Sequence, residues 1–533
     1  MVIFLCSFFK NREILNNWYG GWIKQDCNLG KCIESFQDIV ILFSQPWGLG
    51  ELAYKLYRPV VSLSYSINFK MSSLNEATIY HATDLLVHYI NGLFIYLIIK
   101  KITNNFLPGL IGLSLFLFHP AVYEIIPTLD RRHEVIAGMF GLLSLFYVEK
   151  SKTKFNRAFV FSLFFYLLGN LSKEIIVVFI PPLMFLSLFG VKKVNYKNLN
   201  LGKITKSFSY LFITISIWVF TQYLFKGYQS YNKILDHTFI ELIERSNVFF
   251  SNFLYHTIPN IKQPSKLIYF VLFLGIIHTI LFFIDSKNRF YLIISFSIIL
   301  QFLFVESLSS LTILFPNVNF VIRLILNVYL IWLMFYLITK ITKATKSYFL
   351  VVFTLSLLCI FGIRVFFGFL GLRGGYVSSI FFVFIISLIV DFILKEKVHN
   401  MLYSYVLFFW IVFIVFSGVN TNILLWNQAT NFNKAFYNEL SEIIESNSSI
   451  DKIILEDQPY IFWDYEYGRP NTIVYSVQEF TVDAWLYHNF PNRKINVEQL
   501  SKSSIDIKNI SSNISLDSIC VEGTCNITII FNQ

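Results

Sequence analysis

Apolar runs long enough to form helices alternate with short polar stretches over most of the chain. The runs lie near residues 84–100, 106–118, 134–148, 157–171, 175–190, 207–225, 267–284, 290–305, 320–338, 348–367, 376–394 and 402–418. Residues 1–9 are also apolar, and we interpret them as the tail of a first helix. This pattern predicts an all-α polytopic membrane protein with about 12 to 13 transmembrane helices.

The pattern changes after residue 418. Residues 431–444 fit a helix, and the short runs at 452–457, 471–476 and 526–531 are typical of strands. We therefore expect two domains: a transmembrane domain over 1–418, with loops at 10–80 and 226–266, and a small α/β domain over 419–533. Residues 239–256 within the second loop fit an amphipathic helix at the membrane interface.

Composition agrees with a membrane location. Of 533 residues, 55% are hydrophobic and 14% are charged, whereas soluble proteins have about 25% charged residues. The net charge is +10, but Lys and Arg cluster at every second connection rather than in one patch, which argues against a nucleic-acid partner. The clusters are Lys100/Lys101, Lys150/Lys152/Lys154, Lys192/Lys193/Lys197, Lys287/Arg289, Lys340/Lys343/Lys346 and Lys395/Lys397.

Basic connections face the cytoplasm in helical membrane proteins. We therefore expect a multi-pass protein of the cell (inner) membrane, with both loops and the C-terminal domain outside the cytoplasm. Two cysteine pairs, Cys27 with Cys32 and Cys520 with Cys525, then lie on the oxidising side, where either pair can form a disulfide. The absence of His or further Cys at ligand spacing beside them makes zinc the weaker interpretation.

Ionisable residues gather at the predicted outer ends of helices, in segments 57–60, 119–134, 172–174 and 371–376. A channel or an ion-coupled transporter would place them near the middle of the membrane instead. Cations at headgroup depth suit a lipid phosphate, and carboxylates beside them suit a general base. The alternative is that these cations only extend toward lipid headgroups.

Several short motifs follow one another in these segments. They are Tyr57-Arg58-Pro59, His81 and His88 on one helix, His119-Pro120 with Glu124, Arg132 with Glu134, Lys173-Glu174, and later Arg373 with Tyr376. In this order the chain resembles the GT-C glycosyltransferases. The subgroup it resembles is the protein O-mannosyltransferase-like one, which includes the transmembrane-and-tetratricopeptide mannosyltransferases and bacterial relatives. The resemblance covers residues 57–190 well, 240–266 and 368–380 loosely, and the tail not at all.

The resemblance implies transfer of a sugar, with inversion, from a polyprenyl- or dolichyl-phosphate donor to a hydroxyl of a protein, lipid or glycan outside the cytoplasm. It requires no metal or other cofactor. It also implies a lipid-phosphate and substrate site formed by Arg58, His119, Arg131, Arg132, Lys173 and Arg373.

Two features depart from the family pattern. The family has an acidic pair after its first helix, but Lys10-Asn11 stands there in this chain, so Glu13, Glu124 and Glu134 are our candidates for the catalytic base. Asp84 replaces an Asn, and no tetratricopeptide repeats follow the membrane part.

Other functions stay open. A polysaccharide polymerase or ligase has a similar number of helices, and a lipid-linked-glycan transporter or a catalytically inactive scaffold also fits the topology. Individual residues have structural alternatives as well. Arg58 can pair with a carboxylate, His81 and His88 can pack between helices, and Glu124 and Glu134 can belong to an ion-pair cluster.

Overall fold

The structure is a computed structural model. It describes residues 36–44, 57–71, 77–119, 131–190 without 153, 200–225, 348–366, 375–395, 431–456 and, at the C-terminal end, several strands and single positions between 458 and 531.

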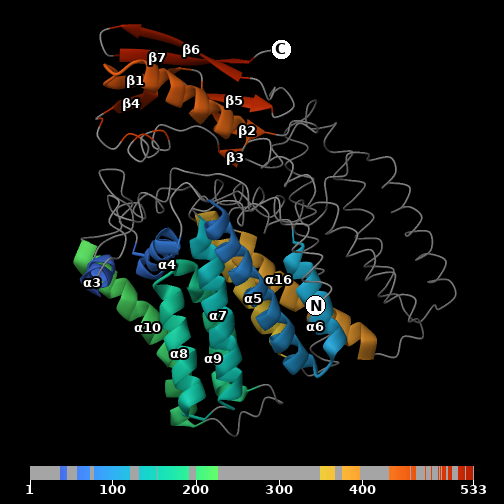
Figure 1. The fold of residues 1–533 in the computed structure, drawn as a ribbon. Helices are drawn as coiled ribbons and strands as arrows, with labels where there is room; N and C mark the ends of the chain where they lie inside the picture. Colours follow the sequence, from blue (N-terminus) through green and yellow to red (C-terminus); the bar gives the residue numbers. More distant parts are fainter. Residues whose placement is uncertain are drawn as a thin grey trace, which may run out of the picture.

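Most of the described residues form helices that lie side by side (Figure 1). They are α5 (Ala77–Thr103), α6 (Phe106–Leu117), α7 (Arg132–Lys150), α8 (Arg157–Asn170), η4 (Glu174–Phe179), α9 (Ile180–Phe189), α10 (Leu201–Phe225), α15 (Phe349–Phe366) and α16 (Gly375–Lys395). Two shorter helices, α3 (Phe36–Ser44) and α4 (Pro59–Met71), lie near one end of this bundle (Figure 1). Buried Phe, Ile, Leu and Val side chains fill the space between the helices.

Every apolar run predicted within the described residues is helical. Three helical stretches are long and apolar enough to cross a membrane: Thr78–Thr103, Leu201–Thr221 and Gly375–Phe392. The segment over residues 10–80, predicted as an outer loop, contains α3, α4 and the start of α5. The predicted helices near 239–256, 267–284, 290–305, 320–338 and 402–418, and the apolar residues 1–9, lie outside the described residues.

Polar residues between the apolar runs define where helices begin and end. The Asn105 side chain accepts a hydrogen bond of 3.1 Å from the Leu107 amide at the start of α6, and Asn156 caps Phe159 at the start of α8 in the same way. Asn104, between α5 and α6, has a φ of 54°, a conformation that Asn tolerates better than most residues. These asparagines fix the sharp turns between antiparallel helices.

The segment after α8 is not a continuous α-helix. Residues Glu174–Phe179 form the 3-10 helix η4, and α9 begins only at Ile180. Pro181 and Pro182 have no amide hydrogen, so an α-helix running through them from residue 174 would lose two hydrogen bonds. In the first turn of α9 the same prolines cost nothing, because amides there have no partner within the helix.

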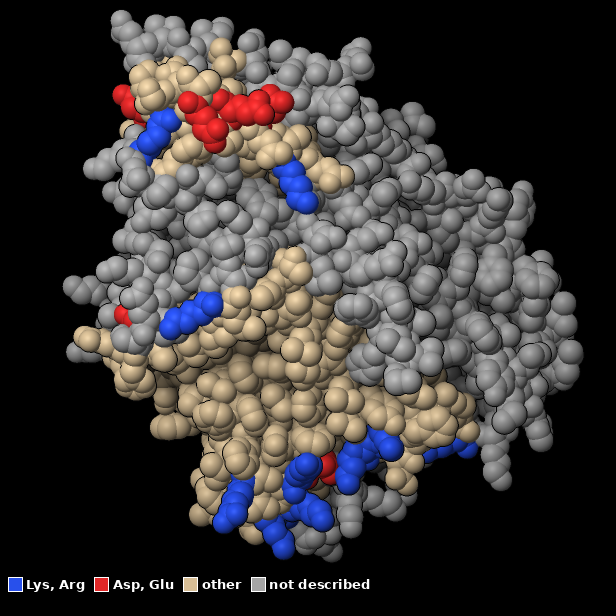
Figure 2. Space-filling view, in the orientation of Figure 1, with Lys and Arg blue, Asp and Glu red and all other residues tan. Residues whose placement is uncertain are grey.

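Cations gather at one end of the bundle, as the alternation of basic connections predicts. Figure 2 shows Lys and Arg together at the lower end of the helices. We call the exposed cations at the end of α5 and between α7 and α8 the basic rim: Lys100, Lys101, Lys150, Lys152, Lys154 and Arg157. Two contacts join helix ends there, since Lys101 Nζ lies 3.8 Å from Glu149 Oε1 and Lys395 donates to the Thr103 carbonyl at 3.2 Å.

The C-terminal part is a mixed α/β unit with a helix over residues 431–446, as predicted. One sheet has the order β4-β1-β7-β6 and the other β3-β2-β5; in the first, β1 is parallel to β4 and β7, and β6 is antiparallel to β7. The strands are β1 (Lys452–Glu456), β2 (Gln458–Trp463), β3 (Val474–Tyr475), β4 (Asn496–Gln499), β5 (Lys502–Asp506), β6 (Ile514–Val521) and β7 (Thr524–Phe531). Figure 1 draws them beyond the upper end of the helices, away from the basic rim.

One of the two cysteine pairs falls within described strands. The register of β6 and β7 places Cys520 opposite Cys525, and Cys525 is disulfide-bonded. Cys27 and Cys32 lie outside the described residues. Cys359, on α15, is an exposed free thiol.

We predict that the partner of Cys525 is Cys520. Peptide mapping without reductant should recover the two residues in one crosslinked peptide, while N-ethylmaleimide labels Cys359. Cys520→Ser should destabilise the hairpin by about 2 kcal/mol, because the closed loop is short. Alkylation of both Cys520 and Cys525 in unreduced protein would contradict the assignment.

Close packing between α7 and η4 requires a glycine. A Cβ atom at Gly141 would lie 2.5 Å from Phe179 Cε2, and the Phe179 ring is itself held 4.9 Å from the ring of Phe381. The buried Phe179 ring therefore has no room to move away. On α10, by contrast, a Cβ atom at Gly202 would meet no atom closer than 3.7 Å.

We predict that Gly141→Ala lowers the thermal unfolding midpoint of the purified protein. Alanine favours a helix by about 1 kcal/mol over glycine, but overpacking costs about 1–3 kcal/mol. The matched control Gly202→Ala keeps the helix gain without the clash, so its midpoint should stay equal or rise. Equal shifts in both variants would show that the α7–η4 contact is not tight.

Candidate functional site

Three cation–carboxylate pairs lie at the end of the helices opposite the basic rim. They are Arg58 with Glu174, Arg132 with Asp84, and Lys173 with Glu134. Arg132 is the first residue of α7, whose last residue, Lys150, belongs to the basic rim. The partners come from four elements, because Arg58 precedes α4, Asp84 is on α5, Glu134 is on α7 and Glu174 begins η4.

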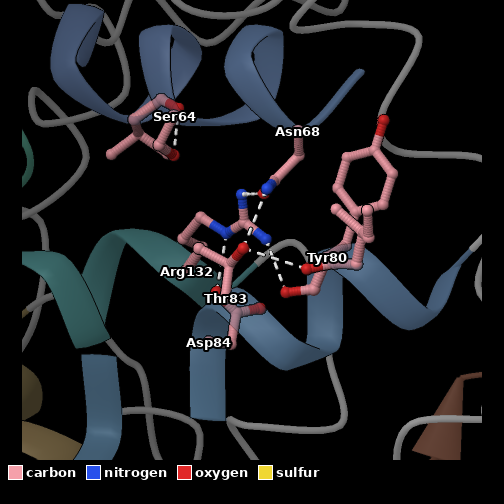
Figure 3. Close-up of polar contacts among 8 residues, drawn as sticks. Ser64, Asn68, Tyr80, Thr83, Asp84 and Arg132 are labelled. Carbon is pink, nitrogen blue, oxygen red and sulfur yellow. Dashed lines mark hydrogen bonds and ion pairs between the residues drawn. The ribbon is translucent and has the colours of Figure 1, made fainter. Parts of the chain in front are cut away.

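Arg132 is fully buried, and each nitrogen of its guanidinium has a partner (Figure 3). Nε donates to Asp84 Oδ1 at 2.6 Å, Nη1 donates to Asn68 Oδ1, and Nη2 donates to the Tyr80 carbonyl at 2.8 Å. The guanidinium carbon also lies 4.4 Å from the centre of the Tyr65 ring. One side chain from α7 thus binds α4 through Asn68 and Tyr65, and α5 through Asp84 and Tyr80.

The second pair lies on the same helix, two residues farther along. Glu134 Oε1 accepts from Lys173 Nζ, and both side chains are buried. Lys173 stands just before η4, where it is the N-cap residue with extended backbone. This contact fixes the start of η4 against the start of α7.

The third pair is the most accessible of the three. Arg58 Nη2 lies 3.2 Å from Glu174 Oε2, and the Glu174 side chain is 38% exposed, whereas that of Arg58 is 8% exposed. Glu174 directly follows Lys173, so the second and third pairs are neighbours along the chain. The Val60 amide also donates to the Leu171 carbonyl at 3.4 Å, which holds the start of α4 beside this segment.

The three pairs contain three cations and three carboxylates, so their charges cancel. A bound phosphate would therefore not meet an uncompensated cluster of cations. It would have to replace a carboxylate as the partner of one cation. Arg58 is the most suitable cation, since the side chain of its partner Glu174 is the most exposed of the three carboxylate side chains.

A neutral hydrogen-bonded group connects α5, α7 and α16 nearby. Asn91 Nδ2 donates to Tyr376 Oη at 2.8 Å and to the Val135 carbonyl at 3.0 Å, and His88 Nδ1 lies 3.0 Å from the same hydroxyl. This contact fits the packing role that the sequence offers for His88 as the alternative to catalysis. Tyr376, the later motif residue, acts here as the partner that joins α16 to α5.

The remaining predicted residues divide into two groups. His119 follows Phe118, the C-cap residue of α6, and is buried. Burial lowers the pKa of His119 to about 3, so its ring is neutral and supplies no positive charge for a phosphate. Arg131 is the partly exposed N-cap residue of α7. Glu13, Glu124 and Arg373 lie outside the described residues. Among the residues that the structure describes, no group of His, Cys, Asp and Glu could hold a metal ion.

Sequence reasoning missed the residues that surround Arg132. The sequence motifs include Asp84 only as a departure from the family pattern, and they do not include Tyr65, Asn68 or Tyr80. A signal was present, because an Asp two turns into an apolar helix needs a buried cation or donor as partner. Comparison of the chain with protein-family models, with curated proteins and with solved structures found no match.

We predict that Arg132→Lys destabilises the folded protein. Lysine keeps the charge but cannot donate to Asp84, Asn68 and the Tyr80 carbonyl at once, and each buried acceptor left without a donor costs about 1–3 kcal/mol. Thermal unfolding of the purified protein measures the effect. Arg157→Lys is the matched control, because Arg157 is also the first residue of a helix but is exposed. Equal stability of the two variants would contradict a structural role for Arg132.

Proposed function

We propose that this protein is an integral membrane glycosyltransferase of the GT-C type. It transfers a sugar from a polyprenyl-phosphate donor to a hydroxyl acceptor outside the cytoplasm. The observation that carries the proposal is the Arg58–Glu174 pair, in which the Glu174 side chain is partly exposed, at the end of the bundle away from the basic rim. Arg58, Lys173 and Glu134 are residues of the motifs on which the family resemblance rests.

The three pairs have different roles, and these roles follow from how deeply each pair is buried. Arg132 and Asp84 are too deeply buried to exchange partners, so they serve as scaffold. Lys173 and Glu134 join η4 to α7 and place the paired Lys173 ammonium next to Glu174 along the chain. Arg58 at the accessible edge binds the donor phosphate, because its planar guanidinium offers two parallel donors to phosphate oxygens.

Binding of the phosphate to Arg58 frees the Glu174 carboxylate. In the transfer step the acceptor oxygen forms a bond to the anomeric carbon, and the bond from that carbon to the lipid phosphate oxygen breaks. The proton of the acceptor hydroxyl passes to a carboxylate, and the polyprenyl phosphate leaves with the electron pair. Of the carboxylate side chains in the three pairs, that of Glu174 is the most exposed, so we assign this proton to Glu174 once the phosphate has replaced it at Arg58. Glu13 and Glu124 stay predictions for the same role.

The test uses the purified full-length protein with polyprenyl-phosphate mannose. We expect Arg58→Gln to weaken donor binding at least about tenfold, and Arg58→Lys to fall between Gln and the parent. Glu174→Gln removes the carboxylate that competes with the phosphate, so donor binding should be equal or tighter. The transfer step is measured in cell membranes, because these contain the natural acceptors. There Glu174→Gln should lower the release of polyprenyl phosphate about 10²–10⁴-fold if Glu174 is the base.

Arg157→Gln provides the control, because it removes an exposed arginine at the other end of the bundle. A parent protein that does not bind the donor would contradict the proposal. Binding without release of polyprenyl phosphate would instead favour a transporter or an inactive scaffold. Normal release by Glu174→Gln would move the base to another carboxylate.

A further inference from the structure

The basic rim at the opposite end of the bundle has no part in the proposed transfer. It contains the exposed cations Lys100, Lys101, Lys150, Lys152, Lys154 and Arg157. The one carboxylate joined to it by an ion pair in the described residues is Glu149, which lies 3.8 Å from Lys101. The rim is therefore strongly positive, as the lower end of the bundle in Figure 2 shows.

The rim borders an apolar surface. Helices α8 and α10 pack against each other through Ser162 and Tyr210, whose hydroxyls lie 2.8 Å apart, and their outward faces carry large apolar side chains. About half or more of the surface of each of these side chains is exposed: Val160, Phe161, Phe164, Phe208, Phe212 and Trp218. We call them the apolar belt. Arg157 is the first residue of α8, so the belt begins within one turn of the rim.

Contacts between the two surfaces keep the cations at the apolar boundary. Lys206 Nζ donates to the Lys154 carbonyl and lies 3.4 Å from Ser151 Oγ, so the start of α10 is bound to the segment between α7 and α8. Lys150 Nζ lies 4.3 Å from the centre of the Phe146 ring. In the same segment Phe155 is 75% exposed between Lys154 and Arg157.

We propose that the basic rim binds the headgroups of anionic phospholipids. An exposed phenylalanine among cations, next to an apolar helix face, matches a membrane interface, where the ring enters the acyl region and the cations meet lipid phosphates. Each Lys or Arg near an anionic membrane surface contributes about fivefold to binding. An acidic protein partner would complement the charge, but its charged surface would not cover the exposed apolar surface of Phe155 and of the apolar belt.

The experiment measures lipid selectivity of the full-length protein in a mild non-ionic detergent. The protein is incubated with mixed micelles of equal phosphatidylglycerol and phosphatidylcholine, and native mass spectrometry counts the retained lipids. We expect the parent to retain phosphatidylglycerol in preference, and this preference to weaken when salt rises from about 0.05 M to about 0.5 M. The triple variant Lys152→Gln, Lys154→Gln and Arg157→Gln should reduce the preference about tenfold or more.

The matched control removes three cations elsewhere, through Lys70→Gln, Lys434→Gln and Lys452→Gln. It should retain the preference of the parent, and equal unfolding midpoints of the two triple variants exclude a folding defect as the cause. A parent without lipid preference, or an unchanged preference in the rim variant, would overturn the proposal. The outcome is independent of the transfer assay, because no rim residue belongs to the proposed site.

Discussion

A single buried guanidinium, that of Arg132, determines how three helices meet. A cation removed from water is tolerated only where a carboxylate neutralises it and each of its donors is satisfied. Asp84, Asn68 and the Tyr80 carbonyl meet these requirements together, and they belong to α4 and α5. The position of α4 at the end of the bundle, and therefore the position of Arg58 just before it, follows from this requirement.

Burial is graded across the three ion pairs, and the proposed function depends on that gradient. Separating a fully buried ion pair leaves two unpaired charges away from water and costs much free energy, whereas a pair with a partly exposed side chain separates at a lower cost. Neutral pairing in the resting state also explains how several cations can lie close together without mutual repulsion. A phosphate that binds at Arg58 adds negative charge close to Lys173. The positive charge of Lys173 partly compensates for the charge of the phosphate.

The sequence predicted the helices well, because long apolar runs have few alternatives to a helix in or near a membrane. It failed at α4, whose residues Ser62, Ser64, Ser66 and Asn68 make the segment resemble a polar loop. The strands were predicted only where apolar and β-branched residues are continuous, as in β7, and not in the polar strand β5. The ion pairs could not be predicted, because Arg132 and Asp84 are 48 positions apart and Arg58 and Glu174 are 116 apart.

The 3-10 helix after Lys173 makes this segment longer along the bundle axis than an α-helix with the same number of residues. Its six residues rise about 12 Å at about 2 Å per residue, whereas six residues of α-helix rise about 9 Å. With the ten residues of α9, the segment extends about 27 Å, close to the hydrocarbon thickness of a bilayer, although it has fewer residues than a standard spanning helix. Two prolines thus let a short segment place Lys173 and Glu174 about 3 Å farther from the opposite end of the bundle than an unbroken α-helix would.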